Sequence, residues 1–172
     1  MTTKRQLLKR SLGLVAAACG ATAMAADTGP IKIGLILPMT GQSASTGRQI
    51  EAAVKLWVAQ NGDKVAGRKV EIILKDDGAV PDATKRIAQE LIVNDKVSVI
   101  AGFGITPTAL ATAPLATQSK TPLVVMAAAT SSITEASPFI IRTSFTLPQV
   151  TTPMADWAIK NNIKKVITLV AD

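Results

Sequence analysis

Residues 97–107, VSVIAGFGITP, contain in order a short apolar run, a glycine-containing segment and the start of a helix. The run Val97–Ala101 predicts a buried strand. Gly102–Ile105 predicts a loop, and Thr106 followed by Pro107 is typical of a helix N-cap and first helical position. This order of strand, loop and helix is the unit from which an α/β fold is built.

The same unit recurs on both sides of this stretch. Apolar runs predict five further strands, at Ile31–Leu37, Val70–Lys75, Pro122–Met126, Phe139–Arg142 and Lys165–Val170. Helical spacing and cap residues predict helices at Ile50–Asn61, from Asp82 onward, at Thr106–Lys120 and at Thr152–Asn161. Strands that alternate with helices through short loops indicate right-handed βαβ units. The sequence therefore predicts an α/β fold in which helices cover both faces of a parallel sheet.

Three loops at the carboxyl ends of the predicted strands are rich in hydroxyls and small residues. They are Pro38–Arg48, Gly102–Thr106 and Ala127–Ser132. Ligands of open parallel sheets bind beyond the carboxyl ends of the strands, so we expect these loops to converge on one binding site.

Each candidate residue in these loops also has a structural interpretation. Thr106 caps its helix or binds an anion there. Thr130 belongs to a capped turn, or follows alanines whose small side chains let a ligand reach the backbone. Phe103 contacts ligand or packs in the core, whereas the helical position of Trp57 predicts a core residue. The pair Asp76-Asp77 is interpreted as capping carboxylates, because no second acidic cluster accompanies it to form a metal site.

The composition excludes several classes of function. Among 172 residues there is no histidine and one cysteine, so triad catalysis and zinc sites built on histidine are impossible. The sequence has no GxGxxG or GK[ST] motif, and aromatic residues make up only 3%. We therefore expect no enzyme, no cofactor, no metal and no nucleic-acid partner.

The amino terminus has the features of an export signal. Four basic residues in the first ten precede an apolar stretch that ends in Ala23-Met24-Ala25. This pattern predicts a signal peptide over residues 1–25 and export from the cytoplasm. Cleavage would remove Cys19 and leave 15 basic and 12 acidic residues, a net charge of +3 in place of +7. Such a mild excess does not predict nucleic-acid binding.

Five short motifs occur together in order: Pro30–Gly34, Met39–Gly41, Gly67–Val70, Lys75–Asp77 and Ala127–Thr130. With them the chain resembles the amino-terminal part of type I periplasmic solute-binding proteins of ABC importers, in the branched-chain amino-acid group. The resemblance implies two α/β lobes with a ligand between them. It places the ligand carboxylate at Thr106, backbone and hydroxyl contacts at Ala128 and Thr130, and a ligand-packing position at Thr46. The expected ligand-binding residues are Thr46, Phe103, Gly104, Thr106, Ala127, Ala128 and Thr130.

The resemblance also divides the chain. It implies lobe one over residues 26–142, a hinge over 143–150 and the first helix and strand of a truncated lobe two over 151–172. It further implies a receptor that delivers a branched-chain amino acid or related carboxylate to a membrane permease. Relatives have an aromatic residue where this chain has Thr46, which leaves other amino acids and aromatic acids open. The alternative function is a ligand-sensing domain of the same fold.

Overall fold

A computed structural model describes residues 29–167, and its centre is a six-stranded sheet. The strands lie in the order β2-β3-β1-β4-β5-β6. Their bounds are β1 Ile31–Leu37, β2 Lys64–Val65, β3 Arg68–Asp76, β4 Val99–Gly102, β5 Leu123–Val125 and β6 Ile140–Arg142. All pairs are parallel except β2 with β3, which form a short antiparallel hairpin. The predicted α/β fold class is confirmed, with a mixed rather than a purely parallel sheet.

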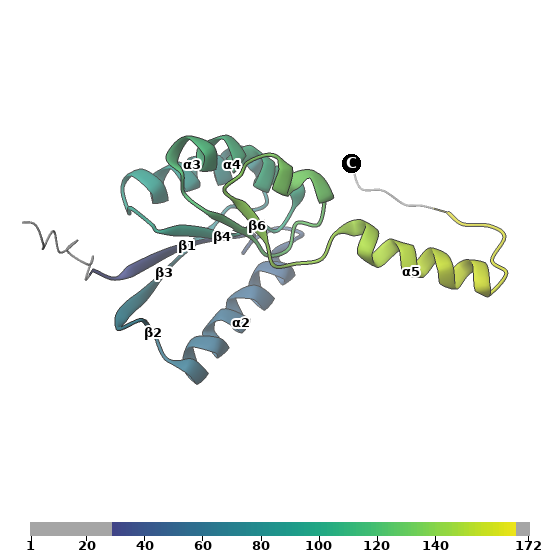
Figure 1. Cartoon of the computed structure of the whole chain (residues 1–172), viewed down its shortest axis with the longest axis horizontal. Coiled ribbons are helices and arrows are strands. Elements are labelled where there is room, and N and C mark those ends of the chain that lie inside the picture. The colour runs from purple at the N-terminus through teal and green to yellow at the C-terminus, as the bar shows by residue number, and fades with distance from the viewer. Residues whose placement is uncertain (1–28, 168–172) are drawn as a thin grey trace, which may run out of the picture.

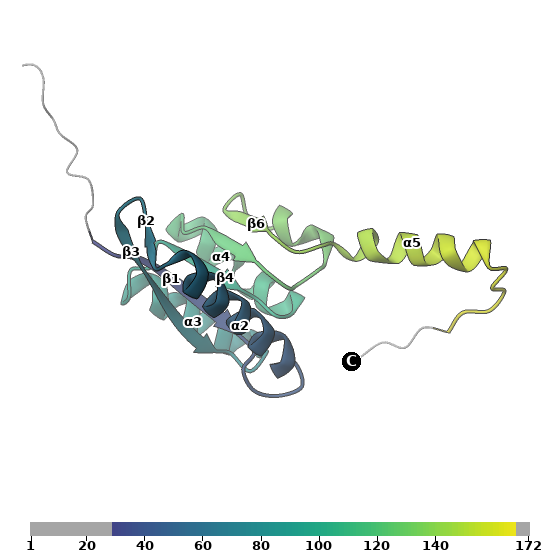
Figure 2. The same cartoon turned by 90° about the horizontal axis from the view of Figure 1, so that it is seen from below.

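Helices cover both faces of the sheet, as predicted. The helices are α2 Ala44–Asn61, α3 Pro81–Val93, α4 Thr106–Ser119 and α5 Leu147–Lys160, with a 3-10 helix η1 at Ser131–Glu135. Figure 1 shows α3 and α4 together on one face and α2 on the other. Helix α5 projects away from these three layers in both views (Figures 1 and 2), and none of its residues is buried.

Several predicted boundaries need correction. Helix α2 begins at Ala44, inside the predicted first loop. Helix α3 begins at Pro81 after the N-cap Val80, so Asp82 is a first-turn residue and not the cap. Helix α5 begins at Leu147, within the predicted hinge, because Thr146 and Gln149 form a capping box there.

The last predicted strand, Lys165–Val170, is not formed in the part that the structure describes. Residues 163–167 are irregular and exposed. The rest of this strand and the predicted signal peptide lie outside the described residues.

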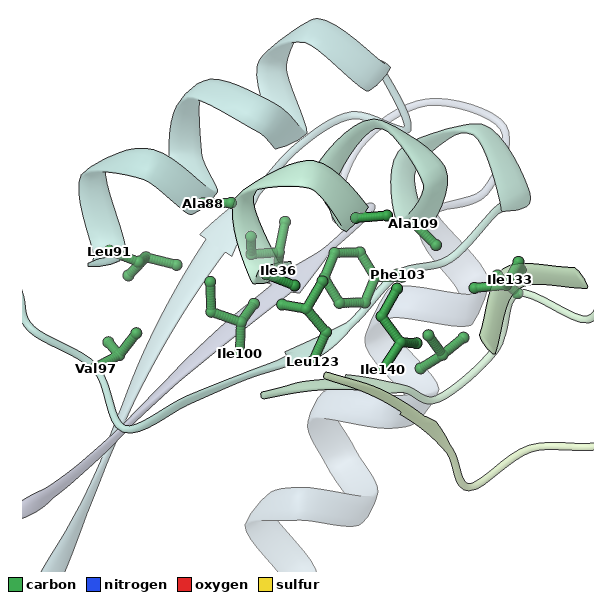
Figure 3. Packing of buried hydrophobic residues seen from close by; sticks show 14 residues of the cluster. Ile36, Ala88, Leu91, Val97, Ile100, Phe103, Ala109, Leu123, Ile133 and Ile140 are labelled. Carbon is green, nitrogen blue, oxygen red and sulfur yellow. The ribbon is translucent and has the colours of Figure 1, made fainter. Parts of the chain in front are cut away.

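The main core lies between the sheet and the layer of α3 and α4 (Figure 3). Phe103 is fully buried there, together with Ile36, Ile100 and Leu123. Its left-handed backbone, with φ of 66°, places the ring among core residues. The prediction that the Phe103 side chain contacts ligand is therefore wrong, and its alternative position in the core is the one observed. The core position expected for Trp57 is also wrong, because 53% of its surface is exposed on α2.

Gly102 lets β4 and β1 approach each other at the carboxyl edge. Its φ is +122°, and a Cβ atom there would lie 2.0 Å from the carbonyl oxygen of Ile36. We expect Gly102→Ala to lower the free energy of unfolding by about 2–4 kcal/mol, through backbone strain and overpacking together. Urea unfolding of both proteins measures this difference.

Gly67→Ala is the matched control for Gly102→Ala. Gly67 has a similar left-handed φ of +78°, but a Cβ atom there would meet nothing within 4 Å. Backbone strain alone should then lower the free energy of unfolding of Gly67→Ala by about 1–2 kcal/mol. Equal losses in the two variants would contradict a role for the close contact with Ile36.

Candidate functional site

A hollow of about 380 Å³ lies at the carboxyl edge of β4 and β5. Its lining comes from the loops that follow these two strands, from the first turn of α4 and from the first residue of α5. The lining residues are Gly104, Ile105, Thr106, Pro107, Ala127, Ala128, Ala129, Thr130 and Leu147. Two of the three predicted loops therefore meet at this edge, where parallel sheets bind ligands.

The polar side chains in this lining are two hydroxyls. The Oγ1 atoms of Thr106 and Thr130 lie 2.7 Å apart, within hydrogen-bond distance, and both residues are half-buried. Interpreting Thr106 as a helix cap is wrong, because Ile105 is the N-cap of α4 and Thr106 is its first helical residue. Its hydroxyl instead faces Thr130 from the opposite loop. One hydroxyl of the pair donates to the other, which leaves the second one's proton for an acceptor.

Backbone N–H groups surround the hydroxyl pair. None of the hydrogen bonds in residues 29–167 uses the N–H of Thr106, Ala129 or Thr130. The N-terminus of α4 adds the positive end of its helix dipole. Hydroxyls and N–H groups gathered at a helix N-terminus form a setting that suits an anion.

The other predicted site residues divide into two groups. Gly104, Ala127 and Ala128 line the hollow. The N–H of Ala128, however, donates to the carbonyl oxygen of Phe103 at 3.0 Å, so the predicted backbone contact cannot come from this N–H. Thr46 lies in the first turn of α2, half-buried, and does not line the hollow.

Four lining residues were not among the predicted site residues. Ile105, Pro107 and Ala129 flank predicted ones, so taking the two loops whole would have included them. Leu147 comes from the first residue of α5, and its N–H donates to the carbonyl oxygen of Ala129 at 2.9 Å. No local pattern marks Leu147, because its place depends on how the chain leaves β6.

The first predicted loop, Pro38–Arg48, does not line this hollow, and a carboxylate of the neighbouring strand β3 holds its start. Asp76 accepts hydrogen bonds from the N–H of Met39 and the N–H of Gly78, both at 2.8 Å, and from the hydroxyl of Thr40 at 2.8 Å. Asp77 is buried and accepts from the hydroxyl of Thr84 at 2.7 Å. The structural interpretation of this acidic pair is thus confirmed. Within residues 29–167 there is no group of three or more potential metal ligands.

These hydrogen bonds make stability depend on pH. Desolvation raises the pKa of Asp76, but the bonds from Gly78, Met39 and Thr40 together outweigh it and lower the pKa below 3.8. A lowered folded-state pKa contributes stability above the unfolded value, and this contribution is lost as the pH falls through the folded one. Between about pH 5 and pH 3, urea unfolding should show a larger loss for the wild type than for Asp76→Asn.

Asp156→Asn is the control for the removal of one negative charge, because Asp156 is exposed on α5, outside the sheet and its helices. Its stability profile should follow the wild type. Parallel pH profiles of wild type and Asp76→Asn would show that the Asp76 carboxylate does not stabilise the first loop.

A second hollow of about 360 Å³ lies between α2 and the sheet. Apolar residues of β1, β3 and α2 line it, and an ion pair between Glu51 and Lys55 at 2.6 Å joins its two charged residues to each other. Ligand sites combine apolar walls with converging polar groups that fix orientation. The hollow at the carboxyl edge has such groups, and the one beneath α2 does not.

Comparison with known proteins identifies the family. A model of the periplasmic binding protein family matches residues 30–172. The chain belongs to this family. The periplasmic binding proteins are a solute-binding rather than an enzymatic class, which confirms the expectation of no enzyme. Within residues 29–167, no helix is long and apolar enough to cross a membrane.

One relative is matched by its sequence, and solved relatives are matched by both sequence and structure. Leu/Ile/Val-binding protein homolog 6 of Brucella abortus is 42% identical over 151 residues, which are 87% of this chain and 39% of that protein. An ABC-transporter solute-binding protein of Rhodopseudomonas palustris, solved with 3,4-dihydroxybenzoic acid, is 67% identical with a TM-score of 0.77. The match covers 78% of this chain and 37% of that one.

A leucine-binding protein of Thermotoga maritima is 31% identical with a TM-score of 0.71, over 77% of this chain and 37% of that one. The chain therefore spans about two fifths of the length of the relatives that it matches. The resemblance to the amino-terminal part of Leu/Ile/Val-binding proteins is confirmed.

Proposed function

We propose that this periplasmic binding protein is an extracytoplasmic receptor of an ABC importer that binds an aromatic carboxylate. The observation that carries the proposal is the hydroxyl pair of Thr106 and Thr130 in a hollow whose other side chains are apolar. The hydroxyls and the nearby N–H groups would hold the carboxylate. The apolar residues around them would contact the remainder of the ligand, and a membrane permease would receive it.

The choice of an aromatic acid over a branched-chain amino acid rests on the identities of the solved relatives and on one implication of the family resemblance. The relative solved with 3,4-dihydroxybenzoic acid is 67% identical, and another from Rhodopseudomonas palustris, solved with 4-hydroxybenzoate, is 47% identical. The leucine-binding relative of Thermotoga maritima is 31% identical and the Leu/Ile/Val-binding protein homolog of Brucella abortus is 42% identical, both below the 67% of the first. The resemblance to the branched-chain group also implies an aromatic residue at the position of Thr46, which this chain lacks.

Isothermal calorimetry on the full-length product of the gene tests this proposal. The panel is 3,4-dihydroxybenzoate, 4-hydroxybenzoate, leucine and isoleucine. We expect both benzoates to bind more tightly than either amino acid. If leucine or isoleucine binds more tightly than the benzoates, the ligand is a branched-chain amino acid and the proposed aromatic ligand is wrong. If none of the four binds, the proposed receptor function is contradicted.

Export through a cleaved signal peptide is the second part of the proposal. The charged start, the apolar stretch and Ala23-Met24-Ala25 predict cleavage after Ala25. The intact mass of protein recovered from the periplasm should correspond to a chain that begins at Ala26. A chain that begins at a lipidated Cys19, or that keeps Met1, would contradict it.

A further inference from the structure

One guanidinium lies directly behind the loop that carries Thr130. Nη1 of Arg142 donates to the carbonyl oxygen of Ala128 at 2.9 Å and to that of Phe145 at 3.2 Å. Nη2 donates to the carbonyl oxygen of Thr130 at 2.5 Å. Arg142 is the last residue of β6, and its side chain is half-buried. It therefore joins two sides of the site, the loop after β5 and the segment that leads into α5.

No acidic side chain of residues 29–167 neutralises the charge of this guanidinium. All three of its hydrogen bonds go to backbone carbonyl oxygens. Within residues 29–167, no carboxylate lies within 4.0 Å of it. A half-buried positive charge without a counterion favours an anion nearby, and such charges act more strongly in a partly buried site than in water.

Arg142 donates hydrogen bonds to two residues that line the hollow. Ala128 and Thr130 belong to the lining, and the hydroxyl of Thr130 meets that of Thr106. A second bond between the two segments runs from the N–H of Leu147 to Ala129. The planar fork of an arginine can bind several carbonyl oxygens at once, whereas a lysine ammonium acts as a point charge.

We propose that Arg142 is the positioning and specificity-determining residue of this site. It fixes the loop at 128–130 against the segment that enters α5, and it supplies the positive charge that selects an anionic ligand. This inference rests on the proposed function, because it assumes that the hollow takes a carboxylate. It adds a residue that does not line the hollow and acts from behind its wall.

Two ligands of similar shape but different charge show whether the site recognises the negative charge of the ligand or only its shape. The probes are 3,4-dihydroxybenzoate, which is an anion at neutral pH, and its neutral primary amide. Calorimetry on the full-length gene product gives the ratio of their dissociation constants. For Arg142→Met we expect the affinity for the anion to fall by about tenfold to 100-fold, and the preference for anion over amide to fall by about tenfold.

Arg142→Lys keeps the charge and loses the fork. It should bind both probes more weakly but keep the preference for the anion within about threefold of the wild type. Arg86→Met removes one arginine from an exposed position on α3 and should change neither dissociation constant. An anion preference in Arg142→Met equal to that of the wild type would overturn the inference.

Hydrogen exchange without ligand tests the positioning role separately. The amide of Leu147, which is bonded to Ala129, should exchange faster in both Arg142 variants than in the wild type and in Arg86→Met. Unchanged exchange would overturn the positioning role. If the wild type binds neither probe, the proposed function fails, and the exchange rates still decide whether Arg142 holds the loop. Thermal unfolding by circular dichroism confirms that each variant is folded.

Discussion

Thr106→Val should weaken binding of 3,4-dihydroxybenzoate to the full-length gene product by about tenfold to 150-fold. The hydroxyl of Thr106 lies 2.7 Å from that of Thr130, at the N-terminus of α4. A hydrogen bond to a charged group contributes about 1.5–3 kcal/mol, and this range converts into the stated loss of affinity. Valine has nearly the shape of threonine, so the change removes the hydroxyl and little else.

Thr134→Val is the matched control for Thr106→Val. Thr134 lies in η1, shortly after the ligand loop, and its hydroxyl makes only a long bond of 3.5 Å to the carbonyl oxygen of Ser131. The dissociation constant of Thr134→Val for 3,4-dihydroxybenzoate, measured by the same calorimetric titration, should equal that of the wild type. An unchanged dissociation constant for folded Thr106→Val would remove Thr106 from the site.

Residues 26–172 as an isolated polypeptide should bind the same ligand at about millimolar affinity or not at all. The hollow is open, so the face of the ligand opposite the two loops would stay in water. Each charge-assisted hydrogen bond offers about 1.5–3 kcal/mol, and association costs at least about 4 kcal/mol. Without apolar burial on the second face, at about 25 cal/mol per Å², little net affinity remains.

The same polypeptide should also associate with itself. Helix α5 projects from the sheet and its helices (Figure 2) and has no buried residue. Met154, Trp157 and Ile159 are 60% or more exposed on it. Exposed apolar residues in such numbers favour association with a second apolar surface, and another copy of the polypeptide supplies one. Light scattering measures the mass, and submicromolar binding by a monodisperse monomer would contradict both expectations.

Much of the sheet could be predicted from the sequence because most of its strands contain short apolar runs, and two of them, β1 and β4, stop at Pro38 and Gly102. Strand β1 has the predicted bounds, Ile31–Leu37. Strand β2 was missed because its two residues, Lys64 and Val65, are exposed and too few to show a pattern. Residues 165–167, the described part of the strand predicted at Lys165–Val170, pair with no strand among residues 29–167, and an apolar run alone does not form a strand without a partner.

The site could be predicted less completely, since it depends on contacts between distant segments. Hydroxyls at strand ends indicated Thr106 and Thr130 correctly as residues that come together. The left-handed backbone conformation of Phe103 directs its side chain into the core, and the amino-acid composition of the loop does not predict that conformation. The bonds of Arg142 go to three carbonyl oxygens, which every residue has, so the sequence carries no signal for them.

A crystal structure of the full-length gene product with 3,4-dihydroxybenzoate tests the central claim most directly. We predict that a carboxylate oxygen of the ligand lies within about 3.2 Å of the hydroxyl of Thr106 or Thr130, at the N-terminus of α4. The guanidinium of Arg142 should keep its bonds to the loop behind the ligand. A ligand bound in the hollow beneath α2, or one whose carboxylate points away from both hydroxyls, would contradict this assignment.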